Sequence, residues 1–236
     1  LYFLPKLSGR FKLILFDNRG AGRTDVSDKE YSIKLFADDA AGLMEALGIK
    51  RAHVLGISMG GMIAQELALN HPEKVEKLVL ASTYCGGKKS VPIPGEAAQV
   101  IMDISAALAE KGNWDKEIAR KLMPLVFTQK FMEENPEIVD VNVQLILTAP
   151  TPLEALARQV EAILLGFDAC DRLPQIRAPT LIVAGKKDRY IAPENAEIMA
   201  RIIPNSKLVY FKNSAHMLQE EIEKVTNTVL GFLTTP

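Results

Sequence analysis

The sequence predicts an α/β fold in which a mostly parallel, doubly wound sheet is interrupted by a helical insertion. Short apolar runs alternate with amphipathic helices near both ends of the chain, which is typical of a parallel sheet covered on two faces. Residues 86 to about 172 break this alternation, because they contain no convincing strand and several helical patterns. We therefore assign residues 1–85 and 173–236 to the core and residues 86–172 to the insertion.

Each expected element follows from a local pattern. Apolar runs predict strands, and three-four spacing of apolar residues predicts helices, with Gly48 and Gly112 ending two of them. The helix before Gly112 presents one apolar face. The expected strands span 12–16, 52–56, 77–82, 179–184 and 207–211, and the core helices span 33–47, 59–70, 194–202 and 219–233.

Composition excludes several classes of function. A net charge of −1 leaves no basic face for nucleic acid, and no apolar run approaches the roughly 18 residues of a membrane span. Cys85 and Cys170 favour a reducing, cytoplasmic setting over a disulfide, although both flank the insertion and a bridge is possible. No His/Cys/Asp cluster has the spacing of metal ligands, so we expect no metal and no organic cofactor.

The segment 52–64 carries the most specific signal, because a Gly-x-Ser-x-Gly turn stands between a strand and a helix. This pattern predicts a nucleophile elbow, with Ser58 raised on a strained turn. We expect Gly56 and Gly60 to relieve the crowding between strand and helix. The alternative is an ordinary turn without chemistry.

A serine needs a base, and a base needs an orienting carboxylate. Of three histidines, His53 lies in a strand and His71 ends a helix, so both are assigned structural roles. His216 follows the last strand in a loop, where a catalytic base is usually displayed. Asp188 follows the strand 179–184 and is the candidate acid.

Four motifs in order resemble the α/β-hydrolase family, of the esterase, lactonase and carbon–carbon-bond hydrolase kind. They are the Asp-x-Arg-Gly-x-Gly turn at 17–25, the elbow at 56–61, the acid strand at 178–188 and the histidine loop at 214–221. The order Ser58, Asp188, His216 is the order of that family. For the turn at 17–25 a structural role is favoured, with Arg19 as its anchor.

The resemblance implies that the insertion is a lid over the serine. Apolar residues of the lid would then line an acyl site, although each could instead simply pack the lid. The candidates are Trp114, Met123, Val126 and Phe127, in the same region as Leu125.

The resemblance also implies strands that these 236 residues do not contain. In the family, three strands precede the strand expected at 12–16. The third of them lies in the sheet between the strands expected at 12–16 and 52–56. The loop after it donates a backbone N–H to the oxyanion hole. A gap there would leave buried backbone groups unpaired, at about 1–3 kcal/mol each. We favour, in order, a longer form of the chain, a strand from another chain, and a closed, rearranged sheet. Only the Met59 N–H remains as an oxyanion donor, so the 236 residues alone should catalyse slowly.

These residues predict a serine hydrolase that cleaves a carboxylic ester or lactone of a small, largely apolar substrate through an acyl-enzyme. The same triad would serve carbon–carbon-bond or enol-lactone hydrolysis, or a perhydrolase activity. A different class is also open, namely a receptor that binds a small molecule in a hydrolase-like pocket with little turnover. An exposed sheet edge would favour a homo-oligomer.

Overall fold

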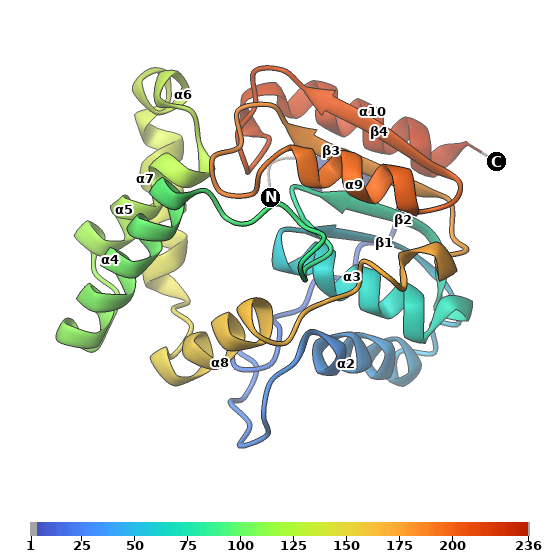
Figure 1. Ribbon diagram of the computed structural model, residues 1–236, viewed down its shortest axis with the longest axis horizontal. Coiled ribbons are helices and arrows are strands. Elements are labelled where there is room, and N and C mark those ends of the chain that lie inside the picture. Colours follow the sequence, from blue (N-terminus) through green and yellow to red (C-terminus); the bar gives the residue numbers. More distant parts are fainter. Residues whose placement is uncertain (1–3, 236) are drawn as a thin grey trace.

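The protein is described by a computed structural model covering residues 4–235. Its sheet has four parallel strands in the order β1-β2-β3-β4, so spatial order follows chain order (Figure 1). The strands are β1 (Ala52–Ile57), β2 (Val75–Ala81), β3 (Thr180–Gly185) and β4 (Ser206–Phe211). Four of the five predicted strands are thus confirmed to within two residues.

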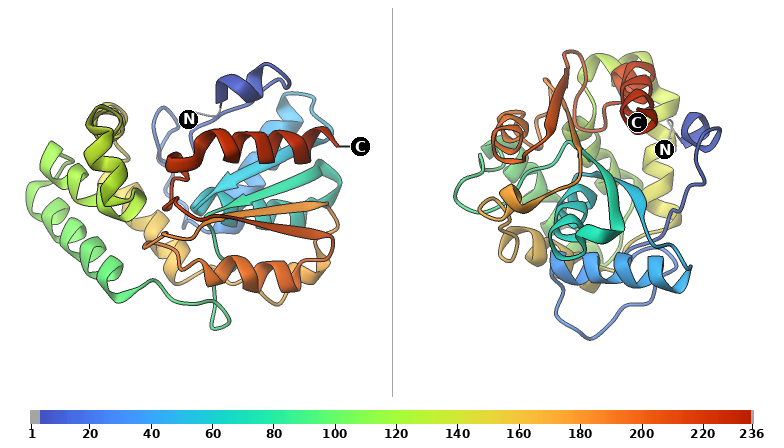
Figure 2. Two further views of the ribbon diagram at one scale, coloured as in Figure 1. Left: turned by 90° about the horizontal axis from the view of Figure 1, so that it is seen from above. Right: turned by 90° about the vertical axis from the view of Figure 1, so that its right-hand side faces the viewer.

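Helices cover both faces of this sheet, which confirms the doubly wound arrangement (Figure 2). One face is covered by α2, α3 and α9, and the other by α10 and the short α1. The bounds are α1 (Leu4–Ser8), α2 (Ile33–Ala46), α3 (Met59–Asn70), α9 (Glu194–Ile202) and α10 (Ile222–Thr234), with single turns η1 (Pro72–Lys74), η2 (Leu173–Gln175) and η3 (Gln219–Glu221).

Alternation along the strands explains the two cores. In β2, Leu78 and Leu80 join the core under α2 and α3, whereas Val79 and Ala81 join the core under α10. Successive side chains of a strand point to opposite faces, so a run that is apolar throughout is buried on both sides. Every residue of β2 except Glu76 and Lys77 is buried, as the continuous apolar pattern predicts.

The prediction of a strand at 12–16 is wrong, because this segment pairs with no strand of the described chain. Ile14, Leu15 and Phe16 are 40%, 65% and 46% exposed. A groove of about 520 Å³ separates them from β1, and its walls are formed by residues 14–18 together with β1, α2 and α3. The apolar run therefore lacks the neighbour that a strand needs, and the sheet has not closed up to replace it.

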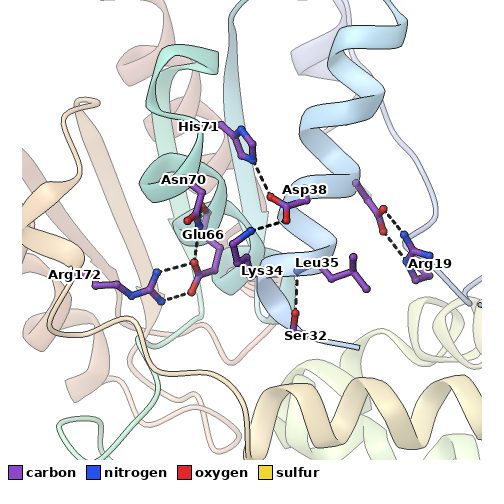
Figure 3. Close-up of polar contacts among 10 residues, drawn as sticks. Arg19, Ser32, Lys34, Leu35, Asp38, Glu66, Asn70, His71 and Arg172 are labelled. Carbon is purple, nitrogen blue, oxygen red and sulfur yellow. Dashed lines mark hydrogen bonds and ion pairs between the residues drawn. The ribbon is translucent and has the colours of Figure 1, made fainter. Parts of the chain in front are cut away.

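Polar contacts fix the helices of one face to each other (Figure 3). His71 at the end of α3 is hydrogen-bonded to Asp38 of α2 at 2.9 Å. Arg19 donates to Asp39 of α2 through two nitrogens, as expected of the residue that anchors the turn at 17–25. His71 thus has a structural contact, in agreement with its predicted role. The contact between His71 and Asp38 holds the outer helix α2 against α3, whose first residue, Met59, follows Ser58.

The insertion consists of α4 (Gly95–Lys111), α5 (Lys116–Val126), α6 (Gln129–Glu134), α7 (Pro136–Thr148) and α8 (Leu153–Leu164). Gly112 ends α4 with a φ of 73°, as predicted. The helices α4 to α7 stand beside the ends of the strands, and α8 returns to the core (Figures 1 and 2). Their own buried cluster includes Ala119, Met123 and Val143.

The ends of the insertion are tied together by a disulfide between Cys85 and Cys170, contrary to the expectation of free thiols. Both cysteines are buried, and the backbone N–H of Ala169 donates to the Cys85 carbonyl at 2.8 Å. Beside this bridge, Arg172 forms an ion pair with the buried Glu66 of α3 (Figure 3). Sequence spacing could not reveal the bridge, because 85 residues separate the cysteines and only the folded core brings them together.

Among residues 4–235, no helix combines the length and the apolar character that crossing a membrane would require.

Replacing both cysteines should lower stability, because the bridge closes a long loop in the unfolded chain. We expect Cys85→Ser/Cys170→Ser to reduce the free energy of unfolding by about 2–4 kcal/mol. Urea unfolding of the variant and of wild type, each with and without reductant, measures this loss. A wild-type midpoint that does not move on reduction, and that equals the midpoint of the variant, would contradict the bridge.

Candidate active site

The turn between β1 and α3 has the geometry of an elbow. Ser58 adopts φ 54° and ψ −123°, a conformation that costs about 1–3 kcal/mol for a residue with a side chain. Its N–H donates to the Ala81 carbonyl of β2 at 3.0 Å, and its carbonyl accepts from Gly61 N–H at 2.8 Å. Its side chain makes no capping hydrogen bond to the helix, so the hydroxyl is left free of that task.

Close packing at the elbow requires glycine at two positions. A Cβ at Gly56 would lie 2.1 Å from the Gly60 carbonyl oxygen, and a Cβ at Gly61 would lie 2.6 Å from the Thr83 side chain. A Cβ at Gly60 would meet no atom within 4 Å. The expectation that glycine relieves crowding is therefore right for Gly56 and wrong for Gly60. Gly60 takes part through its carbonyl oxygen, and a side chain at Gly60 would meet no neighbour.

Sequence reasoning missed two residues that follow β2, and one of them, Thr83, supports the elbow directly. The Thr83 hydroxyl donates to the Ser58 carbonyl at 2.8 Å. Ser82 has a φ of 44°, is 2% exposed and is linked to β3 through its N–H to the Val183 carbonyl at 2.9 Å. The sequence offered only a run of small polar residues after a strand, which gave no sign that the run would buttress Ser58.

The candidate acid and base are in direct contact. Nδ1 of His216 lies 2.8 Å from Oδ2 of Asp188, and both side chains are almost fully buried. An ionised carboxylate only accepts hydrogen bonds, so beside such a carboxylate Nδ1 is the donor of this contact. Oδ1 of Asp188 accepts from the N–H groups of Tyr190 and Ile191 at 2.8 and 2.9 Å. Each carboxylate oxygen thus has a donor, which holds the group in one orientation.

The loops that carry this pair are packed tightly against each other. A Cβ at Gly185, the last residue of β3, would lie 2.2 Å from the Ser214 carbonyl oxygen. The Lys187 N–H donates to that same carbonyl at 3.0 Å. The loop after β4 therefore lies directly over the loop after β3, which brings two residues 28 positions apart into contact.

Two tyrosines follow strands of the sheet at this end, and one of them, Tyr190, lies beside His216. The ring of Tyr190 lies 5.0 Å from the His216 ring, centroid to centroid, at 49°. Burial, with the charge of Asp188, raises the pKa of Tyr190 above its usual value. Burial, with Tyr190, likewise raises the pKa of Tyr84, which follows β2. Both phenols stay neutral at physiological pH, so Tyr190 lies beside the imidazole without adding charge.

The structure does not bring all predicted site residues together. It records no hydrogen bond between the Ser58 hydroxyl and any described residue, so His216 and Ser58 are not joined as His216 and Asp188 are. Catalytic hydrogen bonds are often long before substrate binds. No backbone carbonyl of the described chain accepts from the Met59 N–H at the start of α3. That N–H is therefore available at the position expected for an oxyanion donor.

A cavity of about 380 Å³ lies within the insertion, next to the histidine loop. Trp114, Met123 and Val126, three of the residues expected at an acyl site, line this cavity together with Met217, the residue after His216. Phe127 does not line the cavity, because its ring packs against Phe131 at 5.3 Å inside the insertion. Asn142 and Thr151 are polar wall residues that the sequence did not single out; the other wall residues are Leu122, Leu145, Ile146, Ala149 and Leu156.

Within residues 4–235, no three or more His, Cys, Asp or Glu side chains gather closely enough to hold an ion.

Comparison with known proteins identifies the family. The family model described as serine aminopeptidase, S33 matches residues 8–223. The chain belongs to this α/β-hydrolase family. The match begins before the turn at 17–25 and runs through the elbow, Asp188 and the histidine loop, so it includes all four motifs.

Similar proteins are hydrolases of several kinds. A 2-hydroxy-6-oxononadienedioate/2-hydroxy-6-oxononatrienedioate hydrolase of Pseudomonas putida is 31% identical over 97% of this chain and 79% of its own. The solved enol-lactonase of Burkholderia xenovorans LB400 is 28% identical, with a TM-score of 0.84 over 98% of this chain and 84% of its own. A thermophilic esterase from Thermogutta terrifontis is also 28% identical, with a TM-score of 0.81 over 98% and 82%. The chain is therefore a hydrolase of the α/β-hydrolase type.

The crowding at the elbow predicts a sharp difference between two glycines. We expect Gly56→Ala to lower the free energy of unfolding by about 3 kcal/mol or more, because its Cβ would press on a backbone oxygen that cannot move away. Gly42→Ala, on the exposed side of α2 with no atom within 4 Å, should be neutral or stabilising by up to about 1 kcal/mol. Urea midpoints of the two variants test this, and equal midpoints would disprove the close crossing.

Proposed function

We propose that this hydrolase cleaves a carboxylic ester or lactone of a small, largely apolar substrate, with Ser58 as the nucleophile. The observation that carries the proposal is the buried contact between His216 and Asp188, at the same end of the sheet as the strained turn of Ser58. The carboxyl ends of parallel strands meet at one edge, so residues after β1, β3 and β4 can act on one substrate.

The reaction follows from the roles of these groups. Nε2 of His216 takes the proton of the Ser58 hydroxyl as the oxygen attacks the substrate carbonyl. The Met59 N–H donates to the oxyanion of the tetrahedral intermediate. The imidazolium then protonates the leaving alcohol, and an acyl-enzyme remains on Ser58. Water attacks this acyl group with the same histidine as base, which releases the acid and restores the serine.

Asp188 contributes orientation rather than proton transfer. Its two oxygens are held by three N–H groups, one of which is Nδ1 of His216. This fixes the tautomer that keeps Nε2 free to accept a proton, and it stabilises the imidazolium as that charge forms. Burial of both side chains strengthens the attraction because little water screens it.

The insertion supports the choice of substrate, in the role of a lid. The walls of the 380 Å³ cavity carry no charged side chain, and Asn142 and Thr151 are their only polar side chains among the described residues. Such walls suit an apolar, uncharged acyl group. The lid would also exclude water from the serine while the chemistry proceeds.

A second candidate is the hydrolysis of an enol-lactone or of a carbon–carbon bond by the same triad. It is favoured by the two relatives above whose names give those activities. The initial test is therefore the serine itself, and the preferred substrate is decided afterwards by comparing rates.

Removing the nucleophile or its orienting acid should abolish activity without unfolding the protein. We expect Ser58→Ala to remove hydrolysis of a short-chain nitrophenyl ester, and Asp188→Asn to lower kcat by about 10⁴-fold because the wrong tautomer is held. Steady-state rates, with circular dichroism as the check on folding, measure both effects. Equal rates for wild type and Ser58→Ala would contradict the enzyme and favour a receptor.

Filling the cavity should change the acyl preference. Ile146→Trp should lower kcat/KM for an octanoyl ester roughly tenfold relative to an acetyl ester, because a bulkier wall excludes the longer chain. Val141→Trp is the matched control, since Val141 lies on the same helix, is 48% exposed and does not line the cavity. If both variants change the octanoyl-to-acetyl ratio equally, the cavity is not the acyl site.

A further inference from the structure

The insertion rests on the core next to the candidate acid and base. Two side chains from outside residues 86–172 pack against its main buried cluster, and these are Tyr190 and Met217. Tyr190 is two residues after Asp188, and Met217 directly follows His216. The Met217 N–H also donates to the Val126 carbonyl at the end of α5, at 3.1 Å. The main buried cluster of the insertion therefore contacts the segments that hold the Asp188–His216 pair.

Glu220 of η3 joins these two parts through a single carboxylate. Its Oε1 accepts from the Thr128 N–H, just before α6, at 2.8 Å. Its Oε2 accepts from the Ala215 N–H, directly before His216, at 3.1 Å. One side chain thus binds the insertion with one oxygen and the histidine loop with the other.

We propose that Glu220 is a positioning residue that fixes the histidine loop to the docked insertion, so that His216 is held in place only while the insertion is closed over the core. This inference rests on the proposed function, in which His216 is the base. The lid would then do more than exclude water, because its closure would also complete the support of the imidazole.

The chemistry of the carboxylate explains why glutamate suits this place. Both of its oxygens accept hydrogen bonds, and bonds from N–H groups to a charged acceptor are about twice as strong as neutral ones. Glutamine has the same shape but only one accepting oxygen, and its amide nitrogen would face an N–H group as a second donor. A glutamine at 220 can therefore hold the insertion or the histidine loop, but not both.

The neighbouring Glu221 shows that the two acids have different tasks. Glu221 accepts from the Asn213 N–H at 2.8 Å and from the Ser214 hydroxyl at 3.4 Å, both in the histidine loop. Its described contacts include none with the insertion. Burial acts to raise the pKa of Glu221, but the Asn213 N–H and Lys224 outweigh it and lower that pKa. Glu221 shapes the loop from within, whereas Glu220 connects the loop to the insertion.

The two hydrogen bonds of Glu220, to the Thr128 and Ala215 N–H groups, form what we call the clasp. Amide hydrogen exchange of the complete, ligand-free protein tests the clasp without relying on catalysis. In Glu220→Gln, which keeps one accepting oxygen, the amide of Thr128, of Ala215 or of both should exchange about tenfold faster, while those of the central strand β3 stay unchanged. Glu223→Gln is the matched control, since Glu223 is exposed and pairs only with Lys6 among the described residues. It should alter neither amide. Unchanged exchange at both amides would overturn the clasp.

Kinetics test the positioning role. We expect Glu220→Gln to lower kcat roughly tenfold on a short-chain ester, with KM changed less than about twofold, because a displaced base slows the chemical step more than binding. Unchanged kcat together with faster exchange at either amide would overturn the positioning role. A wild-type protein without activity that depends on Ser58 would instead refute the proposed function, and the exchange result would still decide whether the clasp exists.

Discussion

The close crossing of β1 and α3 is the constraint on which the rest of the site depends. The carbonyl of Gly60 lies against Gly56 with no room for a side chain, and this forces Ser58 into a conformation that residues with a side chain rarely adopt. Two hydrogen bonds from the end of β2 and the residues after it stabilise this conformation. The Ala81 carbonyl accepts from the Ser58 N–H, and the Thr83 hydroxyl donates to the Ser58 carbonyl. A strained turn persists only where its surroundings fix it in this way. The polar links of α2 and α3 extend that support to the outer layer.

The acid and base are held by a different kind of interaction. Ser58 is fixed by backbone packing, whereas the Asp188–His216 pair is fixed by hydrogen bonds between loops that follow β3 and β4. Loops are less rigid than a strand–helix crossing, and these loops also carry the residues that contact the insertion. The site therefore combines one rigid half with one half whose support comes partly from the insertion.

Sequence patterns predicted the elements that local chemistry determines. Continuous apolar runs gave β1 to β4, and the Gly-x-Ser-x-Gly turn gave the elbow, because each signal lies within a few residues. Family order pointed to Asp188 and His216, which the fold brings into contact. The segment 12–16 failed as a strand because pairing depends on a neighbour and not on its own apolar residues. The Cys85–Cys170 bridge, the Thr83 support and the exclusion of Phe127 from the cavity all depend on distant contacts that no local pattern encodes.

The matching of strand order to chain order has a consequence for biosynthesis. As the polypeptide leaves the ribosome, β1 and β2 can pair at once, and every later strand adds at the same growing edge. The five helices of the insertion emerge before β3, so they must fold to one side while the edge of β2 is still unpaired. Ser58 is translated roughly 160 residues ahead of His216, an interval of about 10–30 s at ordinary elongation rates. Under the proposed mechanism, the nascent chain carries Ser58 without its base until residue 216 has been translated.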